Sequence, residues 1–183
     1  MTMRLRIAVA PSGLTRALIE GRVASDRLAL DHVAVAPITT AMRRMVRSLD
    51  YDVCEMAFTT YLCAKALGKE ITAVPVFLTR NLHHWAAFRH TASDIREPKD
   101  LEGRRIVVNR GYTVTTGLWV RGILQSEYGV DLAKVIWMPT DEEHVAEYRA
   151  PGNVDYAWRG KSAGIASTVM VRWRLRRVSE TGT

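Results

Sequence analysis

The chain has 183 residues, of which 48% are hydrophobic and 25% are charged, and its net charge at pH 7 is +7. These proportions are typical of an ordinary soluble globular protein, and the length allows one large domain or two small ones. No apolar run is long enough for a membrane span, and the first one stops at Ala10, before a signal peptide would be complete. We therefore expect a cytoplasmic protein with no membrane partner.

The positive charge is concentrated at the C-terminal end of the sequence. From Arg159 onward there are six Lys or Arg residues and one acid, Glu180, so this tail carries +5 of the +7. Residues 1–158 carry only +2, which argues against a nucleic-acid-binding face. The tail also lacks the strand–turn–helix pattern of the preceding sequence. We predict that residues 159–183 are a non-native continuation, such as a truncated or frame-shifted gene would produce.

Predicted strands and helices alternate through the first ninety residues. The hydrophobic periodicity predicts strands over residues 4–10, 28–36, 51–54, 72–77 and 85–89, and helices over residues 14–20, 37–49 and 59–67. Either Thr59 or Thr60 is expected to cap the third helix. Strands that alternate with helices indicate a parallel sheet covered by helices, so the predicted fold class is α/β.

A second α/β region follows a polar stretch that contains Pro98. Strands are predicted over residues 105–108 and 135–138 and from residue 154, and helices over residues 114–128 and 141–148. Gly129 is expected to end the longer helix. We therefore predict a first lobe over residues 1–90, a linker over residues 91–99 and a partial second lobe over residues 100–158.

The cysteines and histidines do not form a recognisable metal site. Cys54 and Cys63 are nine residues apart, outside any metal or redox spacing, and are expected to be small buried side chains. His83 and His84 are adjacent, with no Asp, Glu or Cys at metal spacing, so no metal ion is predicted. One of the two histidines is expected to face a cleft as a proton donor or acceptor, and the sequence leaves open which one.

Polar residues follow the predicted strands of the first lobe. Glu55 comes after the third strand, where a carboxylate can transfer protons or can pair with a cation at the sheet edge. Ser12, Thr59 and Thr60 offer hydroxyl groups, and Arg80 can bind a carboxylate through two parallel hydrogen bonds. Open α/β sheets bind ligands at the carboxyl ends of their strands, so one cleft rimmed by strand ends is predicted.

A second group of candidate residues surrounds the start of the long helix of the second lobe. Arg110, Tyr112, Thr113, Thr115 and Thr116 lie before the helix or in its first turn. The unpaired N–H groups and the helix dipole favour an anion there by roughly 0.3–1 kcal/mol. The glycine spacing of a nucleotide-binding loop is absent. Together, the candidate residues of the two lobes favour a small anionic ligand, which could be aromatic.

Several blocks of the sequence carry a resemblance to a known family. They are Tyr51-Asp52-Val53-x-Glu55-Met56, Tyr61-Leu62, Pro75-Val76-Phe77 with Arg80 and His84, Tyr112-x-x-Thr115, Trp119-Val120-Arg121-Gly122-Ile123-Leu124-Gln125 and Glu127-Tyr128-Gly129-Val130. With these blocks the chain resembles the 4,5-dihydroxyphthalate decarboxylase family, which is similar in fold to type II periplasmic binding proteins. The resemblance implies a two-lobed α/β fold of that type. Because family members are longer, it also implies a first lobe without its C-terminal return and an incomplete second lobe.

The resemblance implies a non-oxidative decarboxylation of 4,5-dihydroxyphthalate to 3,4-dihydroxybenzoate, for which no organic cofactor is required. It implies proton transfer by Glu55 or His84, and substrate binding by Arg80, His83 and the helix start at residues 113–116. Two alternatives remain open. The chain could be a binding protein for small anions or aromatic acids, of the ABC-transporter type and without catalysis, or an inactive truncated product. The sequence does not predict the oligomeric state.

Overall fold

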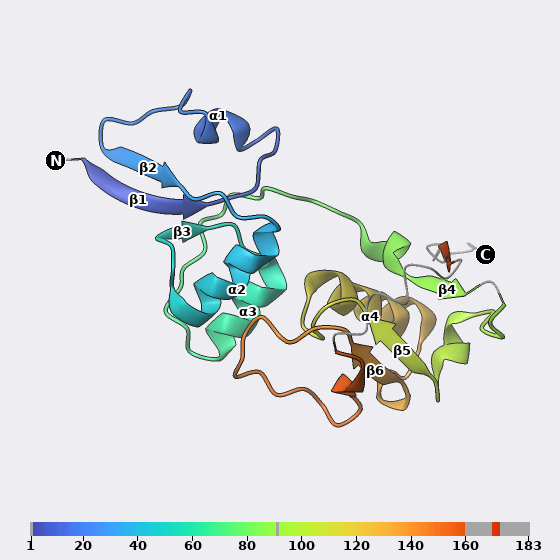
Figure 1. The fold of residues 1–183 in the computed structure, drawn as a ribbon. Coiled ribbons are helices and arrows are strands. Elements are labelled where there is room, and N and C mark those ends of the chain that lie inside the picture. The colour runs from blue at the N-terminus through green and yellow to red at the C-terminus, as the bar shows by residue number, and fades with distance from the viewer. Residues whose placement is uncertain (1, 91, 160–169, 173–183) are drawn as a thin grey trace, which may run out of the picture. The chain divides into compact units, whose positions relative to one another are not determined.

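The computed structural model describes residues 2–90, 92–159 and 170–172 of the chain. The chain divides into two compact units, Met1–Arg80 together with His144–Glu147, and Asn81–Glu143 together with Tyr148–Thr183. Both contain helices and strands, as an α/β fold requires (Figure 1). The first unit ends at Arg80, whereas the sequence placed the end of the first lobe at residue 90 and a linker over residues 91–99. Most of the predicted non-native tail, residues 160–169 and 173–183, lies outside the described residues.

Three parallel strands form the sheet of the first unit. The central strand β1 (Met3–Ala8) pairs with β2 (Leu28–His32) on one side and with β3 (Val53–Cys54) on the other. Helix α1 (Arg16–Ile19) lies between β1 and β2 in the sequence, and α2 (Ile38–Ser48) lies between β2 and β3. Parallel strands need such crossover connections, which is why the alternating pattern predicted this arrangement.

Two small hydrophobic clusters hold the helices of the first unit. Figure 1 shows α2 and α3 (Phe58–Ala66) side by side. Ala8 of β1 and Ala41 of α2 are both fully buried, in one cluster with Tyr51. Their small side chains allow the helix to lie close to the strand. The second cluster consists of Val46, Ala64, Ile71 and Val145.

The fourth predicted strand, over residues 72–77, is wrong. These residues belong to no strand, and the side chains of Val74, Val76 and Phe77 are 71%, 65% and 66% exposed. The apolar sequence is typical of a buried strand. However, a strand forms only where a neighbouring strand pairs with its N–H and C=O groups, which the local sequence cannot specify.

The predicted cap of the third helix is also wrong. The helix begins at Phe58, its N-cap residue is Ala57, and Thr59 and Thr60 lie inside its first turn, where both are buried. The hydroxyl groups of these threonines therefore do not take the position that a capping side chain occupies.

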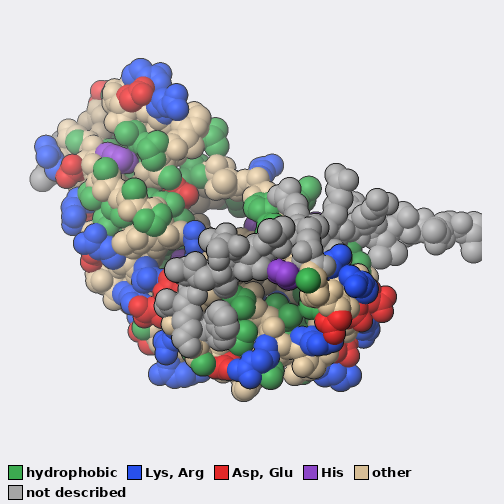
Figure 2. Space-filling view, turned by 45° about the vertical axis from the view of Figure 1, so that its right-hand side comes forward, with side chains coloured by type: hydrophobic (Ala, Val, Ile, Leu, Met, Phe, Trp, Pro, Cys, Tyr) green, Lys and Arg blue, Asp and Glu red, His purple; other side chains and the backbone are tan. Residues whose placement is uncertain are grey.

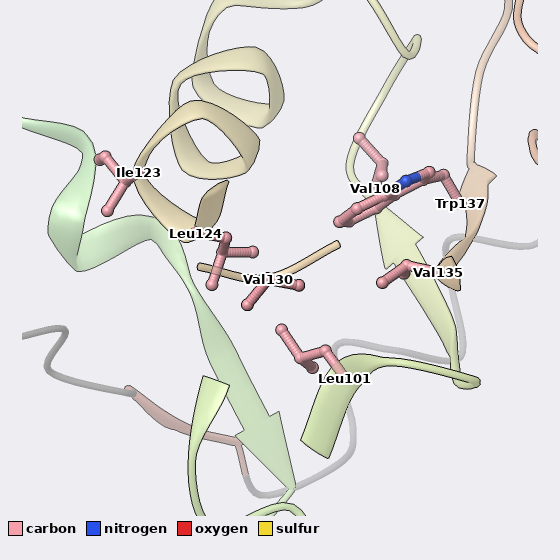
Figure 3. Packing of buried hydrophobic residues seen from close by; sticks show 7 residues of the cluster. All are labelled: Leu101, Val108, Ile123, Leu124, Val130, Val135 and Trp137. Carbon is pink, nitrogen blue, oxygen red and sulfur yellow. The ribbon is translucent and has the colours of Figure 1, made fainter. Parts of the chain in front are cut away.

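The second unit is built on one strand–helix–strand crossover. Strands β5 (Arg105–Val108) and β6 (Ile136–Pro139) are parallel, and α4 (Thr115–Tyr128) connects them. Gly129 ends α4 in the left-handed conformation, with φ 62°, as predicted. The helix and the two strands enclose one cluster of seven buried residues, Leu101, Val108, Ile123, Leu124, Val130, Val135 and Trp137 (Figure 3). The sequence predicted all three of these elements to within one residue at either end.

The remaining elements of the second unit are short. Strand β4 (Phe88–His90) pairs antiparallel with β7 (Met170–Arg172). Four 3₁₀ helices are described, namely η1 (His83–Ala86), η2 (Pro98–Leu101), η3 (Leu132–Lys134) and η4 (Tyr156–Trp158). The strand predicted over residues 85–89 starts only at Phe88, because residues 83–86 form η1. The strand predicted from residue 154 is a single bridge between Val154 and Trp137.

The predicted helix over residues 141–148 is wrong. The segment contains bends and turns, and the three consecutive residues Glu143, His144 and Val145 are all at least 93% buried. Three successive side chains on a helix point in widely different directions, so a short surface helix cannot bury them all. Glu143 belongs to the second unit and His144 to the first, which gives the segment different packing partners from one residue to the next.

The charged side chains are mixed on the visible surface. Among the side chains coloured by type in Figure 2, Lys and Arg lie scattered between Asp and Glu. Ion pairs within the units include Lys69 with Glu147 at 2.6 Å and Lys99 with Glu102 at 2.9 Å. Within the described part of the chain, no helix combines the length and the apolar character needed to cross a membrane.

Candidate functional site

Glu55 joins the ends of two strands in the first unit. Its backbone N–H donates to the carbonyl oxygen of Ala8 at 2.8 Å, and its Oε2 atom accepts from the N–H of Ala10 at 2.9 Å. The carboxylate therefore lies at the carboxyl edge of β1 and β3, as the sequence predicted. Burial and the charge of Glu55 raise the pKa of the neighbouring Cys54 thiol to about 12. Cys54 is therefore a poor nucleophile.

The hydroxyl group of Ser12 organises the loop between β1 and α1. Its Oγ atom accepts hydrogen bonds from the N–H groups of Leu14 and Thr15, both at 3.2 Å, and lies 3.0 Å from the Thr15 hydroxyl oxygen. The Thr15 hydroxyl in turn donates to the carbonyl of Ala10 at 2.6 Å. Ser12 and Glu55 are thus connected to the same short segment after β1, through Thr15 and Ala10.

Thr59 and Thr60, which the sequence singled out as ligand hydroxyls, lie inside the first unit. Thr59 is 7% exposed and Thr60 only 1%. The Oγ1 atom of Thr60 is 3.0 Å from Nδ1 of His144, so its hydrogen-bonding partner is a residue of the same unit. The structure places the Thr60 hydroxyl in the packing between α3 and the segment His144–Glu147.

Arg80 is exposed and follows the segment that does not form a strand. Its guanidinium carbon lies 5.8 Å from the centroid of the Phe77 ring. The residue is therefore not presented by a strand end, in contrast to the prediction. Its exposed guanidinium group still has the geometry to bind a carboxylate.

The two adjacent histidines have different surroundings in the second unit. The Nε2 atom of His84 lies 3.1 Å from Oε1 of Glu127, and both side chains are about one quarter to one third exposed. The ring of His83 stacks on Trp119, with 6.3 Å between centroids and an angle of 15° between the planes. Burial lowers the pKa of His83. A histidine held by a carboxylate is a common arrangement for a proton-transfer group, so His84 is the better candidate of the two.

The partner of His84 was not predicted from the sequence. Glu127 lies 43 positions further along the chain, in the last turn of α4. No local pattern connects it with His84, although Glu127 is part of one of the sequence blocks that carry the family resemblance. The packing of η1 against α4 brings the two side chains together.

The anion position before α4 is occupied by a carboxylate of the chain itself. Oε1 of Glu143 accepts hydrogen bonds from the N–H of Tyr112 at 2.6 Å and from the hydroxyl of Tyr156 at 3.0 Å. Oε2 accepts from the N–H of Thr113 at 2.9 Å and from its hydroxyl at 2.6 Å. The sequence predicted that this loop binds an anion, but not that Glu143 would provide it.

The other predicted residues of this loop shape its backbone. Arg110 has a positive φ of 69°, and its N–H donates to the Thr140 hydroxyl at 2.8 Å. Thr115 and Thr116 lie in the first turn of α4, Thr115 half-buried and Thr116 exposed. The structure therefore brings the N–H groups of Tyr112 and Thr113 and the Thr113 hydroxyl together around one carboxylate.

Arg121 is a further charged residue next to this loop that the sequence did not single out. It is 5% exposed, and its Nη2 atom donates to the carbonyl of Tyr112 at 2.6 Å. Its guanidinium carbon lies 3.7 Å from the Tyr112 ring centroid and 5.6 Å from that of Trp137. Burial lowers the pKa of Arg121, and the negative charge of Glu143 acts in the opposite direction.

Potential metal ligands are dispersed. Among residues 2–90, 92–159 and 170–172, no group of three or more His, Cys, Asp or Glu side chains is placed to hold a metal ion.

The mixed helix and strand content of the two units fits the α/β fold of the family to which the sequence is matched. The chain belongs to the NMT1/THI5-like family, whose sequence model matches residues 14–168. It is similar to two curated relatives, both named 4,5-dihydroxyphthalate decarboxylase. The protein from Comamonas testosteroni is 34% identical over 137 residues, which are 74% of this chain and 41% of the relative. The protein from Pseudomonas putida is 31% identical over 137 residues, which are 74% of this chain and 52% of the relative.

These comparisons confirm the resemblance found in the sequence blocks. The chain spans about half the length, or less, of the curated relatives that it matches.

Proposed function

We propose that this protein binds a dihydroxylated aromatic dicarboxylate and releases one of its carboxylates as carbon dioxide without oxidation. The observation that carries the proposal is the similarity to two relatives named 4,5-dihydroxyphthalate decarboxylase over 74% of the chain. In the proposal, the polar groups described above take the two roles that such a reaction needs, a proton carrier and positions for carboxylates.

The proposal includes the arrangement of the fold. In it, the two units correspond to the two lobes of a type II periplasmic-binding-protein-like protein. Two observations support this correspondence. Each unit has its own parallel strands with crossover helices, and the chain enters the second unit at Asn81 and returns to the first at His144.

The chemistry follows from the positions of the substituents on the proposed substrate. Ionisation of the hydroxyl group para to the departing carboxylate pushes electron density to the ring carbon that bears this carboxylate. An acid then protonates that carbon, the bond to the carboxylate carbon breaks, and its electron pair restores the aromatic ring. The net change is the uptake of one proton and the loss of one carbon dioxide, which gives 3,4-dihydroxybenzoate.

In this proposal the proton is carried by His84 or by Glu55. His84 has the carboxylate of Glu127 at 3.1 Å, which fixes the orientation of its ring. Glu55 lies at the carboxyl edge of the first sheet, with Oε2 bound to the N–H of Ala10. Arg80, with its exposed guanidinium, and the loop before α4 are the proposed carboxylate positions.

A second candidate function is binding of an aromatic acid without turnover. It is supported by the match to the NMT1/THI5-like family, which includes binding-protein-like members. Both functions require binding of the same class of ligand, and only the decarboxylase also releases carbon dioxide. A single experiment that measures binding and carbon dioxide release together therefore distinguishes them.

The test combines turnover with binding. The purified chain is incubated with 4,5-dihydroxyphthalate labelled with ¹³C in its carboxylates, and labelled carbon dioxide and the shift in melting temperature are recorded together. Release of carbon dioxide supports the decarboxylase, and a saturable stabilisation without release supports the binding protein. If neither occurs, both functions are contradicted. Phthalate, which lacks the hydroxyl groups, is the control ligand and should not be decarboxylated.

Matched variants assign the proton carrier. His84→Gln is compared with His90→Gln, which changes an exposed histidine of the same unit, and with Glu55→Gln. Loss of about 10²–10⁴-fold in the rate of carbon dioxide release is expected for the variant that removes the general acid. A rate that is unchanged in both His84→Gln and Glu55→Gln contradicts both assignments.

A further inference from the structure

One carboxylate of the second unit is held by four hydrogen-bond donors. The backbone N–H groups of Tyr112 and Thr113 and the hydroxyl groups of Thr113 and Tyr156 all point to the two oxygens of Glu143, at 2.6–3.0 Å. We call these donors the carboxylate receptor. Three of the four come from Tyr112 and Thr113, which precede Val114, the N-cap residue of α4, so the helix does not use their backbone N–H groups. Charge-assisted bonds of this kind are the strong ones, so the receptor selects a carboxylate by its geometry.

The backbone at Gly111 leaves room for this carboxylate. A Cβ atom on Gly111 would lie 3.0 Å from Oε2 of Glu143 and 3.1 Å from its Cδ atom, closer than ordinary van der Waals contact. The absence of a side chain therefore allows the carboxylate to approach the loop closely. The receptor depends on this glycine as well as on its donors.

Arg121 provides a second, independent observation beside the receptor. The side chain is 95% buried, and its Nη1 atom has no hydrogen-bond partner among the described residues. The same atom would lie 3.4 Å from a Cβ atom on Gly117 in the first turn of α4, and the Nη2 atom binds the carbonyl of Tyr112. The charged donor therefore faces the start of the helix. A buried charged donor without a partner is unfavourable, and an additional acceptor oxygen at this place would remove that cost.

We infer that the carboxylate receptor is a ligand-binding site which Glu143 fills in this structure, and that a small aromatic carboxylate displaces Glu143 from it. Arg121 places a buried positive charge beside the receptor, and its Nη1 atom is available to a further acceptor oxygen of the ligand. That the ligand is aromatic rests on the proposed function. That it carries a carboxylate rests on the geometry of the receptor. Glu143 is then a competitor of the ligand.

The first test uses the unmodified chain and benzoate as the probe. The amide N–H signals of Tyr112 and Thr113 are followed by ¹H–¹⁵N NMR while sodium benzoate is added, with sodium chloride at the same ionic strength as the control. Saturable shifts of both signals with benzoate and none with chloride are expected, because the ligand replaces Glu143 as the acceptor. If the two signals do not respond to benzoate, the inference is overturned.

The second test removes the internal competitor. Glu143→Ala is expected to bind benzoate at least about tenfold more tightly than the unmodified chain, because the ligand no longer has to displace a carboxylate. Glu142→Ala, which removes an exposed glutamate next to it, is the matched control and should bind as the unmodified chain does. Equal affinity in Glu143→Ala and Glu142→Ala contradicts the inference. If Glu143→Ala does not fold, the titration of the unmodified chain decides the question.

A donor variant confirms the place of binding. Tyr156→Phe removes one hydroxyl donor and should weaken benzoate binding by about tenfold, whereas Tyr128→Phe in the same unit should not. Equal effects of the two variants contradict binding at the receptor. The outcome is independent of turnover. If benzoate binds but the assay for the proposed function detects no carbon dioxide, the receptor is supported and the decarboxylase is contradicted. If carbon dioxide is released but the amide signals do not shift, the decarboxylase is supported and the receptor is contradicted.

Discussion

The Oγ1 atom of Thr60 lies 3.0 Å from the Nδ1 atom of His144, although 84 positions separate the two residues in the sequence. Thr60 is 1% exposed and His144 is 2% exposed. The bond fastens the segment His144–Glu147 to α3 of the first unit. Val145 packs with Val46 and Ala64 beside it, and Glu147 pairs with Lys69 at 2.6 Å. This short segment is therefore an integral part of the first unit.

Loss of the Thr60 hydroxyl should destabilise the first unit. Thr60→Val keeps the shape of the side chain but leaves the Nδ1 atom of a buried histidine without this partner, which costs about 1–3 kcal/mol. Urea unfolding measures the change in the free energy of unfolding. Thr72→Val, at an exposed position of the same unit, is the control and should change it by less than about 0.5 kcal/mol. Equal effects at the two positions would show that the buried hydrogen bond does not stabilise the unit.

Two glycines of the second unit should respond to alanine with opposite signs. Gly129 ends α4 with φ 62°, and a Cβ atom there would meet nothing closer than Lys99 at 4.0 Å. Gly129→Ala should therefore lower the free energy of unfolding by about 1–2 kcal/mol, because alanine is strained in this left-handed backbone conformation. Gly122 lies within α4 with open space around it, and Gly122→Ala should stabilise by about 0.5–1 kcal/mol. Chemical unfolding of both variants checks the prediction, which fails if the two changes have the same sign.

Acid should destabilise the second unit through Glu102. The N–H of Asp131 and the ammonium groups of Lys99 and Lys134 lower the pKa of Glu102 from 4.5 to about 2. A carboxyl group whose pKa is depressed in the folded state contributes stability above its unfolded pKa. That contribution decreases as the pH falls from about 4.5 to about 2.

The measurement is the urea midpoint of unfolding as a function of pH. The urea midpoint of the unmodified chain should decrease between pH 4.5 and about 2, and Glu102→Gln should make this decrease smaller. If Glu102→Gln retains the full acid dependence, the hydrogen bonds to Glu102 are not its source.

Cys54 should resist alkylation in the folded protein. Burial and the charge of Glu55 raise the pKa of its thiol to about 12, and the thiol donates to the carbonyl of Glu55 at 3.1 Å. Because the thiolate is the reactive form, iodoacetamide at pH 8 should react at least about a hundredfold more slowly than in urea. Cys63→Ser leaves Cys54 as the one thiol of the chain, so mass spectrometry reports on it directly. Similar rates with and without urea would contradict the raised pKa.

Sequence reasoning was accurate where local patterns determine the structure. The helix that ends at Gly129 and the parallel pair β5 and β6 were predicted to within one residue, since hydrophobic periodicity and a left-handed glycine are local signals. It failed for residues 72–77 and 141–148. The first of these depends on a pairing strand, and the second on burial of consecutive side chains in two units. Neither condition is encoded within a short window of sequence.

The candidate site divides in the same way. The sequence by itself determined the residue types, namely a glutamate after β3, paired histidines and hydroxyl groups at the start of α4, and the blocks that relate the chain to its family. Only the tertiary structure decided their partners. It placed Glu127 against His84, His144 against Thr60, and Glu143 in the loop at Tyr112 and Thr113. These contacts join residues 30 to 84 positions apart, and their formation depends on how the elements pack, because hydrogen bonds reach only about 3 Å.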